Sequence, residues 1–283
     1  MNGFFLINKT KHITSNNVTC SIKKKFNFDK VGHTGILDPL AEGLLIVLIN
    51  KATKLAFLFE NLDKTYQGNM IFNYNYDSLD VTGNILDIKK NILSEKEIQK
   101  AFIYFDQKEY LQTPPMYSAI KIKGQKMYHL ARKQIKIEIP PRKVKIHYCK
   151  KKSPLYNESI DFEAKVSKGT YIRSLARDIA NKMNTYGALK SLNRVQIGDY
   201  NLKEAHTINE VNLQHLIDHK FLFQNTPKLI LNDYLIKLVK NGITLDERQI
   251  ITENPFIVVD RNKNYIAYYI PIEKNKYKPK YFF

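Results

Sequence analysis

The sequence contains no tryptophan, only two cysteines and no long hydrophobic run. Cys20 and Cys149 are far apart and form no CxxC pair, which is too little for a disulfide-bonded scaffold or a structural zinc site. We therefore expect a reducing compartment, the cytoplasm. The longest apolar run, Leu44 to Ile49, is far shorter than the roughly 20 residues that span a bilayer. The N-terminus lacks a basic leader before a long apolar stretch, so neither a membrane span nor a secretory signal is predicted.

Several common catalytic motifs are also missing. There is no GxxxxGK[ST] loop, no GxGxxG after a strand and no GxSxG elbow. The histidines, among them His12, His33 and His129, are scattered without the spacing of metal ligands. We therefore expect no metal and no nucleotide cofactor. If the protein is an enzyme, the chemistry that remains is a redox-neutral reaction on an anionic substrate.

The composition is that of a folded protein with a large positive charge. Of 283 residues, 43% are hydrophobic and 25% charged, which argues against wholesale disorder. Lys and Arg total 45 against 27 Asp and Glu, a net charge of +18 that suits a polyanionic partner such as nucleic acid. Abundant Lys, Asn and Ile can equally reflect drift towards AT-rich codons, so the total charge leaves this question open.

The distribution of charge is more informative than the total. Residues 112–145 carry nine basic residues and one acid, whereas residues 61–100 carry five basic residues and six acids. Codon drift should not leave one segment neutral and another strongly basic. The basic segment also contains rings that can pack on riboses or bases, namely Tyr117, Tyr128 and His129. It is therefore a candidate RNA-binding segment.

Hydrophobic periodicity predicts an α+β fold. Strands are predicted over 4–8, 66–72 and 160–166, and a hairpin over 256–259 and 265–270. Three helices are predicted: one capped by Ser15, one behind a capping box of Ser94 and Glu97, and one carrying Ile172, Leu175, Ala176 and Ile179. The stretch 220–246 is the expected boundary before a small β-rich appendage.

Four residues stand out for possible chemistry, each with an ordinary alternative. Asp38 precedes Pro39 in a glycine-containing loop, but Asp-Pro is also a common turn former. Arg173 near a helix start can pair with a buried carboxylate or lie in solvent. Tyr66 and Tyr171 can stack on bases or mark the edge of the core.

Together these residues belong to a pattern that resembles the bacterial tRNA pseudouridine synthase B (TruB) family. The matching blocks occur in family order over roughly residues 3 to 210. They are GHTGILDPLAEG at 32–43, ATK at 52–54, KTY at 64–66, PPMYSAIK at 114–121 with Gly124, Tyr128, Ala131 and Arg132, SKGTYIRSL at 167–175, and GAL with LNR at 187–194.

The resemblance implies the pseudouridine synthase fold: a mixed, mainly antiparallel central sheet with flanking helices. It implies a catalytic domain over 1–225 with an RNA-gripping insertion at about 112–145, and a short, reduced PUA-like RNA-binding domain over 226–283. The implied reaction converts uridine-55 in the tRNA T loop to pseudouridine, by a cytoplasmic monomer. The implied site residues are Asp38 (nucleophile), Arg173 (orienting Asp38), Tyr66 (stacking and proton transfer), His33, Tyr171 and Leu192 (substrate binding), and Lys121, Lys123, Arg132 and Lys133 (RNA grip).

The sequence departs from the family at Asn73, Tyr76 and Ser78, which puts the turn shape there in doubt, and at Asn193, where an RNA contact is expected to weaken. Two alternatives stay open: a synthase of the same fold acting on another RNA, and a non-catalytic basic RNA-binding or RNA-folding protein. The site of attack, ribose C1′ or uracil C6, is left open as well.

Overall fold

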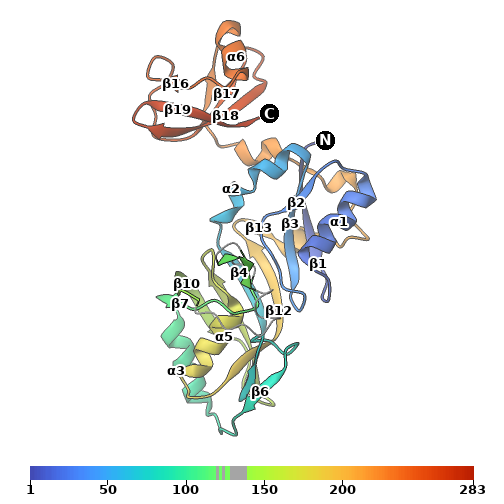
Figure 1. Ribbon diagram of the computed structural model, residues 1–283, viewed down its shortest axis with the longest axis vertical. Helices are drawn as coiled ribbons and strands as arrows, with labels where there is room; N and C mark the ends of the chain where they lie inside the picture. The colour runs from blue at the N-terminus through green and yellow to red at the C-terminus, as the bar shows by residue number, and fades with distance from the viewer. Residues whose placement is uncertain (119–120, 123–124, 128–138) are drawn as a thin grey trace.

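The computed structural model describes residues 1–118, 121–122, 125–127 and 139–283. A long central sheet with helices at its sides forms the larger part of the chain, and a smaller sheet lies beyond one end of it (Figure 1). No helix in these described ranges is long and apolar enough to cross a membrane.

The central sheet is almost entirely antiparallel. Its strands follow the order β14-β1-β3-β12-β4-β11-β10-β7, with β2 beside β3 and β13 beside β12. Only the short pairing of β12 with β3 is parallel. The strands of the central sheet are β1 Gly3–Lys9, β2 Val31–His33, β3 Glu42–Ile49, β4 Lys64–Phe72, β7 Glu109–Gln112, β10 Arg142–Lys151, β11 Ser159–Val166, β12 Gly187–Ile197, β13 Tyr200–Asn201 and β14 Ile217–Asp218.

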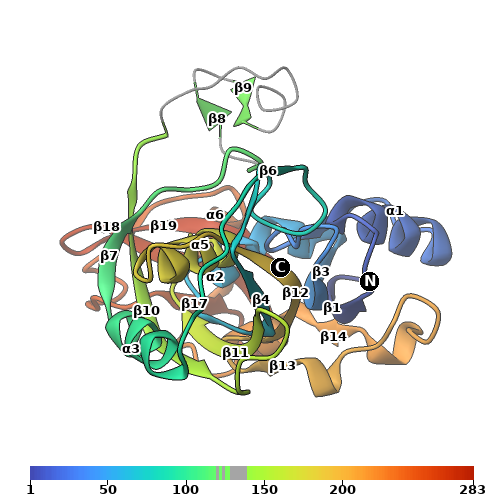
Figure 2. The same ribbon diagram turned by 90° about the horizontal axis from the view of Figure 1, so that it is seen from below.

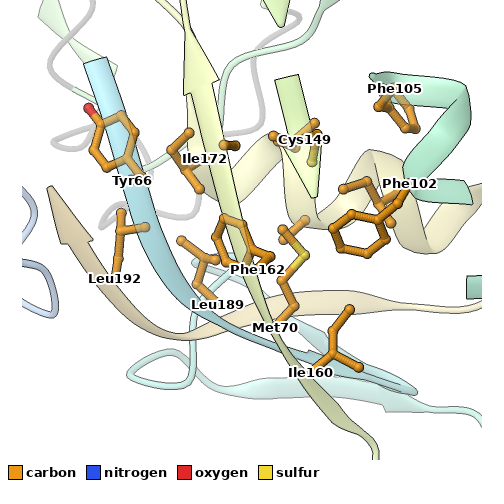
Figure 3. Packing of buried hydrophobic residues seen from close by; sticks show 14 of the residues in the cluster. Tyr66, Met70, Phe102, Phe105, Cys149, Ile160, Phe162, Ile172, Leu189 and Leu192 are labelled. Atoms are coloured by element: carbon orange, nitrogen blue, oxygen red, sulfur yellow. The ribbon is translucent and has the colours of Figure 1, made fainter. Parts of the chain in front are cut away.

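The helices cover this sheet with the apolar faces that the sequence predicts. They are α1 Ser15–Phe26, α2 Phe57–Glu60, α3 Glu95–Phe105 and α5 Ile172–Asn181. Helices α3 and α5 pack against β4 and β11 in one cluster, which buries Met70, Phe102, Phe162 and Leu175 (Figure 3). The mixed, mainly antiparallel sheet with flanking helices is therefore confirmed.

One predicted cap is wrong. Thr14 rather than Ser15 caps α1, because the Thr14 hydroxyl accepts from the backbone N of Asn17. Ser15 is already inside the helix and its hydroxyl points to Leu37, from which it accepts a backbone hydrogen bond at 2.9 Å. By contrast, the capping box of Ser94 and Glu97 on α3 is present as predicted.

The C-terminal part forms a sheet of its own, in the order β15-β17-β18-β19-β16 with helix α6. Its elements are β15 Lys228–Ile230, α6 Asp233–Lys240, β16 Leu245–Asp246, β17 Phe256–Val259, β18 Tyr265–Glu273 and β19 Lys276–Phe282. Strands β17 and β18 pair antiparallel, as the predicted hairpin requires. Leu55, in the segment after β3, and Phe223, in the segment after β14, pack with Ile257 and Tyr268 of this sheet, so a buried joint connects it to the rest of the chain.

The basic segment interrupts the central sheet between β7 and β10. Gln112, the last residue of β7, pairs with Arg142, the first residue of β10, so the chain leaves and re-enters the sheet at one rung. Short strands β8 Lys121–Ile122 and β9 Gln125–Lys126 pair with each other and stand away from the body (Figure 2). A second small hairpin, β5 Tyr74–Tyr76 with β6 Ile85–Ile88, follows β4.

Candidate active site

Asp38 lies in the long connection between β2 and β3. Several backbone bonds fix this connection: the Asp38 carbonyl accepts from Ala41 N at 3.0 Å, and His12 N donates to the Pro39 carbonyl at 2.7 Å. Leu37 is buried in the core beneath it and bonded to Ser15. The loop is thus anchored on both sides of Asp38, which holds the carboxylate at a defined place.

Arg194 of β12 supports the same loop from below. This arginine is 2% exposed. It donates from Nε to the Leu44 carbonyl at 2.8 Å, and its terminal nitrogens reach the carbonyls of Ile36 and Gly35 at 3.4 and 3.5 Å. A buried guanidinium that binds carbonyls ties the loop to the sheet, because each donor left unsatisfied would carry a desolvation penalty.

Gly43 allows the loop to join β3 close to β12. Its φ is +105°, and a Cβ there would lie 2.2 Å from Asn193 Oδ1 and 2.5 Å from the Arg194 carbonyl oxygen. Glycine is required at this position both for the backbone conformation and for space. Asn193, the departure expected to weaken an RNA contact, is thus packed beside Gly43.

Arg173, in the first turn of α5, brings several segments together. Its Nε lies 2.8 Å from Asp38 Oδ2, and its Nη1 lies 3.6 Å from Asp80 Oδ2. Its terminal nitrogens also donate to the backbone carbonyls of Ser78 and Tyr117, both at 2.8 Å. With 5% exposure the guanidinium is nearly enclosed. The arginine therefore pairs with a buried carboxylate, the first of the two alternatives.

Burial raises the pKa of the Asp38 carboxyl, since desolvation disfavours the charged form. The positive charges of Arg173 and Lys9 lower this pKa, whereas the negative charge of Asp80 raises it further. Protein surrounds most of the carboxyl, yet its side chain keeps 37% of its surface exposed. Asp38 is thus a weakly hydrated carboxylate that is still open to a ligand.

Tyr66 of β4 and Leu192 of β12 lie on neighbouring strands of the central sheet. Both lie at one end of the cluster that also contains Leu37, and the Tyr66 hydroxyl points away from the cluster (Figure 3). Tyr66 pairs with Arg194 across the β4–β12 ladder. Tyr171, which precedes α5, lies close enough to Asp38 and Arg142 for both charges to act on its pKa, although burial is the main cause that raises it.

Cationic side chains surround the loop. Lys9 is fully buried and donates to the carbonyls of Thr10 and Ile13, and burial lowers its pKa to about 8. Burial also lowers the pKa of Lys64 to about 8, with the charge of Arg194 adding to that shift. His33 ends β2, and burial and the Arg194 charge lower its pKa. Its buried Nδ1 has no partner among the described residues.

The turn after β4 contains two of the departures, Asn73 and Ser78. Asn73 adopts a φ of +71°, which asparagine tolerates better than most residues, and its amide donates to Glu158 and the Asn91 carbonyl. The Ser78 hydroxyl donates to the Asp80 carbonyl oxygen at 2.9 Å, as a threonine could. The loop thus delivers Asp80 and the Ser78 carbonyl to Arg173.

The predicted grip residues are placed only in part. Lys121 lies in β8, and Lys123, Arg132 and Lys133 lie outside the described residues. Sequence reasoning missed other contributors to the site: Ser15, Asp80, Gln112 and Arg194. Arg194 stands in the family block LNR, and Asp80 is an aspartate that the sequence keeps beside the departures at Tyr76 and Ser78, whereas Ser15 and Gln112 carry no local signal of a role in the site.

Comparisons with known proteins show the family of the chain. A family model described as "TruB family pseudouridylate synthase (N terminal domain)" matches residues 23–172. The chain belongs to this family. A relative named "tRNA pseudouridine synthase B" from Onion yellows phytoplasma (strain OY-M) is 60% identical over 283 residues, all of both chains. Its namesake from Acholeplasma laidlawii (strain PG-8A) is 49% identical over the same length, again 100% of each.

Solved structures resemble the TruB chain in fold. A chain of the "Crystal Structure of a Cbf5-Nop10-Gar1 Complex" superposes with a TM-score of 0.69 at 20% identity, covering 96% of this chain and 79% of that one. A chain of the "Structure of H/ACA RNP bound to a substrate RNA containing 2'-deoxyuridine" gives 0.68 at 19% identity, with 96% and 78% covered. These likenesses confirm the predicted fold.

Proposed function

We propose that this chain converts uridine-55 in the T loop of tRNA to pseudouridine, with Asp38 as the nucleophile. The chain is a tRNA pseudouridine synthase of the TruB family, an isomerase that acts on RNA. The observation that carries the proposal for its site is the contact of Asp38 with Arg173 at 2.8 Å, in which the Asp38 side chain stays 37% exposed.

The reaction detaches uracil from ribose at N1, turns the base and rejoins it through C5, from which a proton leaves. A base in a folded loop must first be flipped out, at a cost of a few kcal/mol. Contacts to phosphates and stacking on aromatic rings supply that free energy. Covalent catalysis by a carboxylate then divides a difficult bond exchange into easier steps.

Each candidate site residue has a role in this scheme. Asp38 attacks the substrate, and Arg173 orients its carboxylate through Nε. Tyr66 stacks on the flipped uracil and assists removal of the C5 proton. Tyr171 and Leu192 enclose the base, and His33 enters the RNA loop or contacts the flipped nucleotide.

The remainder of the chain holds the RNA. We assign residues 1–225 to a catalytic domain whose insertion, about 112–145, grips the T stem-loop through Lys121, Lys123, Arg132 and Lys133. We assign residues 226–283 to a reduced PUA-like RNA-binding domain; its separate sheet supports this division. We further propose that the enzyme acts as a monomer in the cytoplasm.

The test is the Asp38→Asn variant, because this change removes charge and keeps shape. Tritium release from tRNA labelled at uridine C5 should fall below about a hundredth of the wild-type rate, while tRNA affinity stays within several-fold. A tRNA with cytidine at position 55 is the matched substrate control and should release no tritium. Turnover of Asp38→Asn above that level would reject Asp38 as nucleophile, and release from the cytidine-55 tRNA would reject the target.

A further inference from the structure

Gln112 lies at the base of the insertion, where β7 ends and β10 begins. It pairs with Arg142 on the last rung of that ladder, and it is 1% exposed. It therefore touches neither solvent nor a ligand. A buried primary amide needs partners for both its oxygen and its nitrogen, and the identity of those partners shows what the residue connects.

Both halves of the Gln112 amide are used. Its Oε1 accepts from the backbone N of Tyr171 at 2.8 Å, and its Nε2 donates to the Tyr110 hydroxyl at 2.7 Å. That hydroxyl in turn donates to Asp178 Oδ2 at 3.0 Å. Arg177 fixes the other oxygen of Asp178 at 2.8 Å. The chain of bonds thus starts and ends on α5, with the insertion base between.

Tyr171 is the N-cap residue of α5. Its side chain accepts no capping hydrogen bond from the backbone of the first helical turn. The hydrogen bond that Tyr171 N donates to Gln112 Oε1 therefore helps to fix the position of the residue at which this helix begins. Two residues further on, Arg173 reaches Asp38, and the Tyr171 ring lies within the influence of the same carboxylate. A shift of the helix start would move both.

The same helix also holds the residues that follow Gln112. Ser174 Oγ and Arg177 Nη2 donate to the Thr113 carbonyl at 2.8 and 3.0 Å, and Arg173 donates to the Tyr117 carbonyl. Hydrogen bonds therefore join the base of the insertion to the start of α5, and Gln112 makes one of them.

We propose that Gln112 is a positioning residue for the reaction: its amide sets the place of Tyr171 and Arg173 relative to Asp38. The inference rests on the roles proposed above for those three residues. A purely structural Gln112 would affect only the free energy of unfolding. A positioning Gln112 affects the chemical step in protein that is folded and has bound tRNA, because misplacement by about 1 Å can cost up to a hundredfold in rate.

The first experiment compares Gln112→Ala with wild type at saturating tRNA. We expect the single-turnover rate of tritium release to fall about ten- to a hundredfold, while the tRNA Kd stays within about threefold. The control is Gln196→Ala, which removes one amide hydrogen bond, to the Gly198 carbonyl, elsewhere in the sheet and should leave the rate near wild type. A folded Gln112→Ala with a wild-type rate would overturn the proposal.

A second variant, Gln112→Glu, tests the proposal if Gln112→Ala does not fold. Glutamate keeps the shape of the side chain and the oxygen that accepts from Tyr171 N. The introduced carboxylate competes with Asp178 for the single Tyr110 hydrogen, whereas its protonated form donates to the Tyr110 oxygen as the amide does. Burial and the Asp178 charge raise its pKa; the charges of Arg142 and Arg177 oppose them. The rate relative to wild type should therefore rise as the pH falls from about 8 to about 6. A ratio near one at every pH would overturn the proposal.

Asp38→Asn in the same assay separates the two ideas. If Asp38→Asn is inactive and both Gln112 variants react like wild type, only the role of Gln112 is rejected. If Asp38→Asn remains active, the site assignment fails first, whatever the Gln112 variants do.

Discussion

Arg173 meets Asp38 through Nε at 2.8 Å and leaves its two terminal nitrogens to the carbonyls of Ser78 and Tyr117. Those two carbonyls hold the guanidinium plane independently of Asp38. The ion pair is therefore built around a fixed cation, so that Asp38 can react without the arginine losing its place. Preorganised charge of this kind acts on the reacting group without reorganisation.

The pH dependence of the chemical step should reveal the burial of Asp38. Its pKa is raised above the ordinary value of about 3.9, mainly by desolvation, and the reactive form is the carboxylate. As the pH falls, the single-turnover rate should hence begin to drop at a higher pH than an exposed aspartate would give. A rate that stays flat down to the ordinary aspartate range would contradict this picture.

Asp80→Asn should slow the reaction by about tenfold or more, because Arg173 loses a carboxylate partner at 3.6 Å. The same change removes a negative charge that raises the pKa of Asp38, so the acid limb of the pH profile should move to lower pH. Asp77→Asn is the matched control: this aspartate accepts from Asn84 N in the hairpin turn at 2.9 Å. Equal losses in both variants would show that only the turn matters.

Tyr66→Phe tests whether the hydroxyl takes part in removing the C5 proton. If it does, turnover should fall by roughly a hundredfold or more while tRNA affinity stays near wild type. If the ring only stacks, the loss should be small, since phenylalanine keeps the aromatic face. Tyr200→Phe, in an aromatic cluster with Phe4 and Phe59, is the control for loss of a hydroxyl. A near-normal single-turnover rate for Tyr66→Phe would restrict this residue to stacking.

Neutralising Lys121, Lys123, Arg132 and Lys133 together should weaken tRNA binding and flatten its salt dependence. Each phosphate that the protein no longer neutralises should lower the slope of log K against log salt by up to about 1. The control neutralises four exposed lysines outside the insertion: Lys90, Lys96, Lys100 and Lys152. An unchanged slope in the first variant, or an equal change in both, would reject a specific grip by the insertion.

Local patterns predicted the regular elements correctly where one face is buried. The alternation in β11 and the capping box of α3 are encoded by neighbouring residues, so they can be read directly from the sequence. Ser15 shows the limit of such reasoning. Its type suits a helix cap, but the path of the chain into α1 gives that place to Thr14 and turns Ser15 towards Leu37.

The sequence by itself determined the family, the α+β class and the candidate site residues, because ordered motifs and periodicity are local properties. The tertiary structure alone decided that Arg173 is shared by Asp38, Asp80 and two carbonyls, and that Gln112 and Arg194 support the site. Burial, and with it the raised pKa of Asp38, arises from segments far apart in the chain. No pattern within one segment encodes it, since desolvation depends on everything that folds around the group.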